Sequence, residues 1–158
     1  TGDHCTAVGF QAMQKNTTGD GNTGIGEDAL YENQTGTGNT SVGAHNMQNC
    51  KGSQNTSVGA SGLLNLTTGV FNTQIGGYNG GSRLTTGSRN TLIGAGANVA
   101  EGGGALNDTI VIGMTSANKD GQIIIGSNNA VEFVIQLNTG KIKLIFNADH
   151  TVSWEVIE

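Results

Sequence analysis

The sequence lacks proline and is poor in aromatic residues, which make up 4% of it, and in charged residues, which make up 12%. No apolar run approaches the roughly 20 residues that a helix needs to cross a bilayer. The few Lys and Arg are scattered and the net charge is −5, which disfavours nucleic acid and gives no polybasic membrane patch. We therefore expect neither nucleic-acid binding nor membrane insertion.

The chain is instead rich in Asn, Thr and Gly, with 27 glycines, and these residues form an internal repeat. The phrase N-T-x-[I/V]-G occupies residues 22–26, 39–43, 55–59, 72–76 and 90–94. A copy at 5–9 begins with Cys5, and looser copies lie at 109–113 and 122–126. Successive closing glycines are 17, 17, 16, 17, 18, 19 and 13 residues apart. Between the phrases come x-x-A-[L/M] and a turn, x-N-x-T-T-G.

This repeat predicts strands, because the phrase is β-branched at two positions and bounded by glycine. Each glycine would cost a helix roughly 1 kcal/mol. A period near 17 supplies two short strands and two turns, which is one coil. Since so short a repeat cannot bury its apolar face alone, successive coils have to stack. We expect an all-β protein, with a parallel β-roll or β-helix of about seven coils over residues 1–121.

Alternation along each strand predicts which side chains share a face. Thr and Ile/Val share one face, which we expect to point inward, and Asn shares the other with glycine. The Asn residues should form an amide ladder beside the turn, and glycines should allow left-handed backbone at the bends. The predicted structural residues are Asn22, Asn39, Asn55, Asn72 and Asn90, with Ile25, Val42, Val58, Ile75 and Ile93. Because the resulting core is thin, we expect the coils to pack against other copies of the chain.

From Gln122 the pattern changes to longer strands. Residues 122–126, 130–137, 141–147 and 151–157 alternate or are apolar, with turn signals such as Asn138-Thr139-Gly140 between them. We expect residues 122–158 to form an antiparallel β cap, because the open end of a coil stack is an exposed sheet edge.

Catalytic, metal and cofactor sites are not expected. His4, His45 and His150 fall at unrelated repeat positions without metal-ligand spacing. Glu27, Asp28 and Glu32 form an acidic cluster that suits a solvated loop better than a hydrolase pair. Cys5 and Cys50 lie at different repeat positions nearly three coils apart, too far for a disulfide, so both should be free thiols.

The strongest departure from the repeat is residues 77–83, which lose the Ala-Leu pair and gain an aromatic residue and an arginine. Exposed aromatics flanked by amides suit sugar binding, although a simple loop insertion explains the segment as well. The candidate receptor-binding residues are Tyr78, Asn79, Arg83 and Tyr31.

The repeat N-T-x-[I/V]-G, x-x-A-[L/M], N-x-T-T-G over about residues 1–113 resembles the YadA-like head repeats of trimeric autotransporter adhesins, which also occur in phage tail-fibre and large-virus attachment proteins. The resemblance implies a left-handed β-roll, a homotrimer and a non-enzymatic attachment head that binds a host cell-surface glycan or protein. The period is longer than in the bacterial adhesins and no coiled-coil heptads follow, which favours a virion surface over a bacterial cell surface.

Three alternatives remain open. The chain could be a structural shaft segment of a fibre. It could be an ice-binding solenoid, although that function needs regular outward Thr-x-Thr, whereas here Thr alternates with Ile or Val on one face. It could be a polysaccharide-degrading tailspike, which would need a groove lined with carboxylates.

Overall fold

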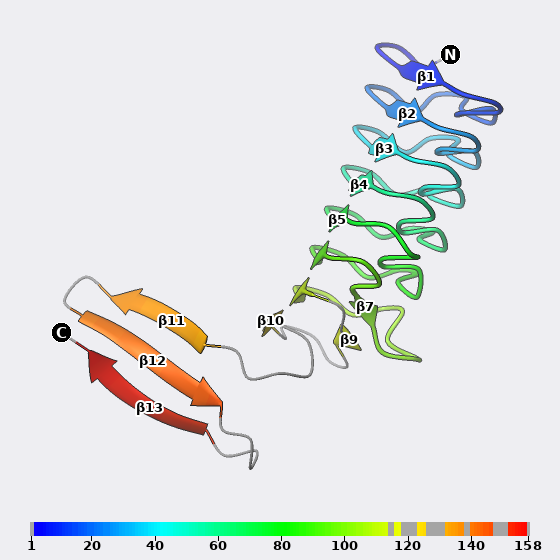
Figure 1. Ribbon diagram of the computed structural model, residues 1–158. Helices are drawn as coiled ribbons and strands as arrows, with labels where there is room; N and C mark the ends of the chain where they lie inside the picture. Colours follow the sequence, from blue (N-terminus) through cyan, green and yellow to red (C-terminus); the bar gives the residue numbers. More distant parts are fainter. Residues whose placement is uncertain are drawn as a thin grey trace. The chain divides into compact units, whose positions relative to one another are not determined.

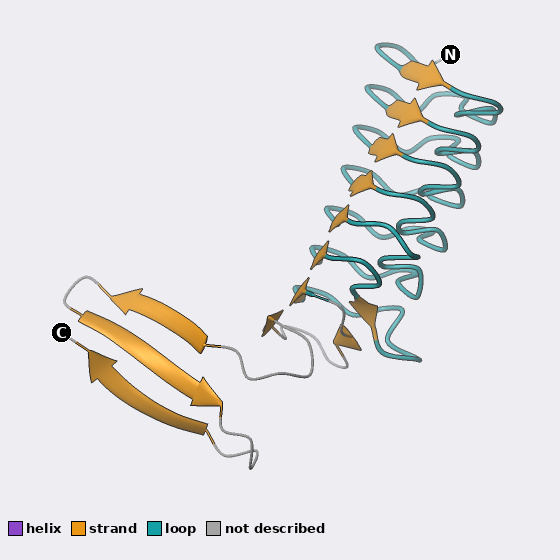
Figure 2. Cartoon of the chain, in the orientation of Figure 1, coloured by secondary structure: helices purple, strands orange, loops and turns teal. Residues whose placement is uncertain are grey.

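The structure is a computed structural model that describes residues 2–113, 116–117, 123–125, 132–137, 140–146 and 152–157. The chain divides into two compact units, Thr1–Ile124 and Ile125–Glu158. The described residues are strands, turns and loops, without a helix (Figure 2). They accordingly contain no helix that could span a membrane.

The first unit is a β-solenoid of stacked coils of about 17 residues, as the repeat predicts (Figure 1). One short strand per coil joins a single eight-stranded sheet, in the order β1-β2-β3-β4-β5-β6-β8-β10. Pairing from β1 to β8 is parallel and joins equivalent repeat positions, for example Thr23 with Thr40 and Ile25 with Val42. The strands are β1 (Thr6–Val8), β2 (Thr23–Ile25), β3 (Thr40–Val42), β4 (Thr56–Val58), β5 (Thr73–Ile75), β6 (Thr91–Ile93), β8 (Ile110–Ile112) and β10 (Ile123–Ile125).

The expected strand at residues 122–126 does not belong to the antiparallel sheet. It forms β10, which hydrogen-bonds to β8 and so continues the sheet of the solenoid. A second, two-stranded parallel sheet pairs β7 (Asn98–Val99) with β9 (Ser116–Ala117). The segment around residue 122 thus repeats the solenoid phrase, as the sequence Gln-Ile-Ile-Ile-Gly suggests.

The second unit contains a three-stranded antiparallel meander of β11 (Glu132–Leu137), β12 (Gly140–Phe146) and β13 (Val152–Ile157). In its register Leu137 pairs with Gly140, and Phe146 pairs with Val152. The antiparallel arrangement expected for this segment is therefore confirmed, and its role as a cap stays a prediction.

The prediction that the Ile/Val residues point inward is wrong. In β2 to β6 and in β8 the middle residue is buried, whereas Ile25, Val58, Ile75 and Ile112 are exposed. The interior beside the strands has little room, because side chains from the opposite wall already fill it. A Cβ added to Gly24 would lie 2.8 Å from Cγ of Met13. In β2 to β5 small or slender residues therefore face inward, and the Thr and the Ile or Val face outward.

The apolar core comes from the other half of each coil, at the Leu/Met position that the repeat also predicted. Met13, Leu30, Met47 and Leu63 stack there, one per coil, with 0–6% of their surface exposed. Towards the end of the solenoid the core gains apolar residues from the strands and turns, which are Leu66, Leu84, Leu92, Ala97, Val99 and Val111. The core is thus a single narrow row that runs through the coils.

The asparagine ladder of Asn22, Asn39, Asn55, Asn72 and Asn90 is confirmed, and all five side chains are 0–1% exposed. Each Oδ1 accepts the backbone N–H of the equivalent residue in the next coil at 2.9–3.0 Å. Each Nδ2 donates to a turn carbonyl near the end of its own coil, such as Gly36 O for Asn22, at 2.7–2.9 Å. The ladder therefore closes each coil and joins it to the next.

The left-handed bends are held mostly by residues other than glycine, contrary to our expectation. The core residues Met13, Leu30, Met47 and Leu63 have φ of 46–55°. The glycine that ends each phrase is different, because its φ is 128–134° in the six copies from Gly9 to Gly94, a region almost restricted to glycine. A Cβ on Gly43 would also collide with the carbonyl group of Gly59 in the next coil.

Candidate functional site

The outward side chains of the solenoid sheet form a regular array that we call the outer ladder. It consists of the Thr and the Ile or Val of β1 to β6, continued by Ile110 and Ile112 in β8. None of these strands carries a charged residue. Parallel pairing in register places like side chains one above another, about 4.8 Å apart. The outer ladder is therefore an uncharged strip of methyl and hydroxyl groups. The strands that carry it are stacked along one side of the solenoid (Figure 1).

The strip is exposed to solvent to a degree that is unusual for β-branched apolar residues. Of the eight large hydrophobic residues that are exposed in the described part of the chain, five belong to the strip, and Ile75 is 45% exposed. These five are Val8, Ile25, Val58, Ile75 and Ile112. A contiguous apolar strip of this kind marks an interaction surface more often than isolated exposed residues do.

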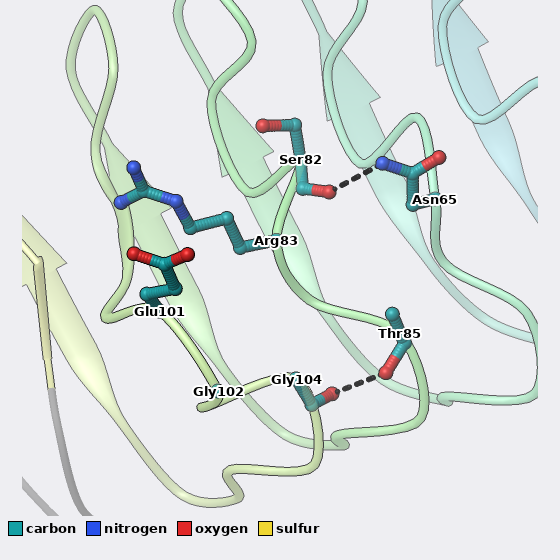
Figure 3. Close-up of a pocket in the computed structure, with 7 residues that line it drawn as sticks. All are labelled: Asn65, Ser82, Arg83, Thr85, Glu101, Gly102 and Gly104. Carbon is teal, nitrogen blue, oxygen red and sulfur yellow. Dashed lines mark hydrogen bonds between the residues drawn. The ribbon is translucent and has the colours of Figure 1, made fainter.

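A second surface lies on the half of the coils that follows the strands. It is a shallow, open depression of about 560 Å³ that we call the polar depression. Its lining residues are Asn65, Ser82, Arg83, Thr85, Glu101, Gly102 and Gly104 (Figure 3). Asn65 Nδ2 donates to Ser82 O at 2.9 Å, and Thr85 Oγ1 donates to Gly104 O at 3.0 Å. Five of the seven lining residues have polar side chains, and the lining comes from three successive coils.

Arg83 and Glu101 bring opposite charges to this depression. Figure 3 shows both side chains at one end of it, with their charged groups on the same side. Neither forms an ion pair within 4.0 Å with any residue that the structure describes, although four other ion pairs exist there. The two charges therefore remain available to a ligand.

The backbone at Arg83 is held by Asn98, which is 6% exposed. Asn98 Oδ1 accepts the backbone N–H of Arg83 at 3.1 Å, and its Nδ2 donates to Asn79 O and Ser82 Oγ, each at 3.2 Å. The buried side chain of Asn98 therefore joins segment 77–83, which departs from the repeat pattern, to the next coil through hydrogen bonds. Sequence reasoning missed Asn98 because the repeat loses its regularity after Gly94.

The four candidate receptor-binding residues do not form one site. Tyr78 is 87% exposed, and Asn79 follows it on the same bend; both have left-handed backbone. Only Arg83 lines the polar depression. Tyr31 lies in the second coil, half-buried, with Lys15 Nζ 4.8 Å from its ring centroid. The ring of Tyr31 is thus already covered by a cation.

Two members of the acidic cluster, Asp28 and Glu32, have separate partners. Glu32 accepts a 2.6 Å hydrogen bond from Lys15 Nζ, which raises the pKa of Lys15. Asp28 lies 3.4 Å from His45 Nδ1 and accepts a 3.0 Å hydrogen bond from Gln48. These carboxylates stabilise contacts between coils and do not face a common cleft.

The histidines and cysteines also lie apart. The residues that the structure describes contain no group of three or more His, Cys, Asp or Glu side chains able to hold a metal ion. Cys5 and Cys50 are free thiols, as expected. Burial raises the pKa of Cys50 to about 11, partly offset by its contacts with Gly52 and Asn55.

Comparison with known proteins adds no family to this description. No family model, curated protein or solved structure matches the chain. The two surfaces and the resemblance of the repeats are therefore the features that bear on the function of the chain.

Proposed function

We propose that the chain is a non-enzymatic attachment head of a homotrimeric fibre or spike on a virion surface. Its β-solenoid would be the body of the head, and a host cell-surface glycan or protein would be the receptor. The observation that carries the proposal is the outer ladder, a solvent-exposed apolar strip without charge.

The occupant of the outer ladder would be other copies of this chain. Parallel copies related by a rotation axis bring the same coil to the same height, so that Ile25 faces the β2 strands of its neighbours. Such packing removes Val and Ile side chains from water at roughly 25 cal/mol per Å². It also compensates for the narrow core within each coil. The number three comes from the resemblance of the repeats to trimeric adhesin heads.

Oligomerisation can be tested by placing charge on the ladder. We expect the wild-type chain to sediment as a trimer and the double variant Ile25→Lys, Ile75→Lys to sediment as a monomer, because a lysine ammonium is costly to bury unpaired. Both positions are exposed in the single chain, so the circular dichroism spectrum should be unchanged. Thr35→Lys with Thr68→Lys, two exposed turn positions, is the matched control and should remain trimeric. A monomeric wild-type chain would contradict the proposal.

Attachment itself requires a second measurement. The trimer of this chain should bind host cells by itself, without a neighbouring domain of the same fibre. A trimer that binds no cells or receptor would support the shaft segment instead. Release of reducing ends from a capsule would indicate a tailspike, but the depression is lined by a single carboxylate, Glu101.

Ice binding is a second candidate, because the outer ladder turns its threonines outward. Each outward threonine nevertheless shares its strand with an outward Ile or Val and not with a second threonine. Methyl and hydroxyl groups then alternate on a regular strip that is available only in a monomer. Thermal hysteresis by a monomeric chain would favour this function, whereas a trimer without hysteresis would exclude it.

A further inference from the structure

The polar depression contains an arginine and a carboxylate that do not satisfy each other. Adjacent coils neutralise some charges of the described solenoid directly, as between Lys15 and Glu32 at 2.6 Å and between Arg89 and Asp108 at 2.6 Å. Arg83 occupies the same repeat position as Lys15 and Glu32, which lies two residues after an inward-facing residue, here Gly81. Unlike Lys15 and Glu32, Arg83 is not neutralised by a described residue of the adjacent coil.

The frame around these two charges is fixed before any ligand arrives. Asn98 holds the backbone of Arg83, and the turn that carries Glu101 is closed by a 2.9 Å hydrogen bond from Gly103 N to Ala100 O. Thr85 ties that turn to the preceding coil through Gly104 O. Prior ordering of this kind lowers the entropic cost of binding.

The lining selects for a hydroxyl-rich ligand. The depression is shallow and open, and five of its seven lining residues carry side-chain hydrogen-bonding groups, so it does not suit the apolar small molecules that fill deep pockets. The guanidinium of Arg83 only donates hydrogen bonds and the carboxylate of Glu101 only accepts them. A pair of sugar hydroxyls can accept from the first and donate to the second. Thr85 Oγ1, which donates to Gly104, keeps lone pairs for another hydroxyl.

We propose that the polar depression binds a neutral glycan, with Arg83 and Glu101 each hydrogen-bonded to sugar hydroxyls. A neutral ligand is favoured because the two side chains cancel each other's charge, and an acidic sugar would meet the carboxylate of Glu101. The inference rests on the proposed attachment function and assigns its ligand class and its position, in the fifth and sixth coils. The glycan site would not overlap the trimer interface on the outer ladder, because none of the residues that line the depression belongs to a strand.

The test is an array of immobilised neutral and sialylated oligosaccharides probed with the full chain. We expect binding to neutral glycans, and a loss of affinity of at least tenfold in both Arg83→Met and Glu101→Gln, since hydrogen bonds to charged groups are the stronger ones. Both side chains are exposed, so both variants should fold. The matched controls are Lys15→Met and Glu32→Gln, which remove charges at the same repeat position outside the depression and should bind like the wild type.

Three results would overturn the inference: no binding to neutral glycans, preferential binding to sialylated ones, or variants of Arg83 and Glu101 that bind like the wild type. An equal loss in the Lys15 and Glu32 controls would do the same, because it would show an effect of charge alone. Sedimentation separates the two proposals. A trimer that attaches to cells with Arg83→Met unimpaired leaves the attachment function standing and removes the glycan site.

Discussion

The carboxamide of Asn55 accepts two hydrogen bonds from Asn72, one from the backbone N–H at 2.9 Å and one from the side-chain Nδ2 at 3.0 Å. Asn72 Nδ2 also donates to Gly87 O at 2.9 Å. The Oδ1 atom of Asn72 accepts a hydrogen bond from the backbone N–H of Asn90. Every polar atom of this buried side chain therefore has a partner, and each partner lies in a different turn or coil. Three parts of the solenoid are joined through one residue.

Asn72→Ala should consequently destabilise the fold by about 2–4 kcal/mol, because it leaves a buried amide N–H and a carbonyl without partners and opens a cavity. Urea denaturation followed by circular dichroism measures the change. Asn65→Ala is the matched control, since that side chain is exposed and makes one hydrogen bond, to Ser82 O. Its cost should be below about 1 kcal/mol. Equal losses in the two variants would contradict the role of the ladder.

Gly43 and Gly38 should differ sharply in their tolerance of a methyl group. Gly43→Ala places a Cβ at φ +133° and against the carbonyl group of Gly59, so we expect a loss on the order of 3 kcal/mol. Gly38 has φ +65°, a left-handed position that Gln54 occupies in the next coil, and its Cβ would meet only Gln54 Cγ at 3.5 Å. Gly38→Ala should cost about 1 kcal/mol. Thermal denaturation of both variants compares them; a costly Gly38→Ala with a tolerated Gly43→Ala would refute the argument.

Ser57 and Gln74 form a buried polar pair whose energy depends on both members being present. Ser57 Oγ donates to Gln74 Oε1 at 2.6 Å. Ser57→Ala alone should cost about 1–3 kcal/mol, because Gln74 Oε1 loses its partner in the interior. In the double variant Ser57→Ala, Gln74→Leu most of that loss should be recovered, since Leu92 already fills the next position of the same stack. A double-mutant cycle measures the coupling, and strict additivity would contradict it.

Cys50 should make stability fall in alkaline solution. Burial raises the pKa of its thiol from 9.0 in the unfolded chain to about 11 in the fold, so the folded state retains the proton to higher pH. The stabilisation is fully present below pH 9 and is lost as the pH rises to about 11, at roughly 1.4 kcal/mol per pH unit. The measurement compares the unfolding free energies of the wild type and Cys50→Ala from pH 8 to 11. The difference between the two pH profiles reports the thiol of Cys50, because all other titratable groups are the same in both chains. Parallel pH profiles would show that Cys50 does not contribute.

The positions of the strands followed from the sequence because the phrase recurs in register. Thr23–Ile25 and its equivalents are strands, and Asn22 and its equivalents form the ladder. Alternation also grouped Thr23 with Ile25 correctly. It could not say which group faces inward, since that depends on how much space the opposite wall leaves, and Met13 takes that space beside Gly24.

The candidate site was only partly accessible from the sequence. Arg83 stood out because it interrupts a regular repeat position, whereas Glu101 lies in a glycine-rich segment after the repeat has lost its period. Without a period, no argument from spacing could bring Glu101 or Asn98 beside Arg83. Tyr31 stood out as well, but the sequence did not reveal that Lys15, sixteen positions earlier, covers its ring.

By itself the sequence determined a stack of coils. A phrase that recurs at nearly constant spacing allows equivalent residues of adjacent coils to pair with each other. Only the tertiary structure decided that the Thr and the Ile or Val of β2 to β6 face outward and that the middle residue of each of these strands faces inward. The reason is that burial depends on the volume remaining between two walls, and one repeat carries no information about the width of that gap. Arg83 and Glu101 likewise line the same depression only because successive coils pack together, although they lie eighteen positions apart in the sequence.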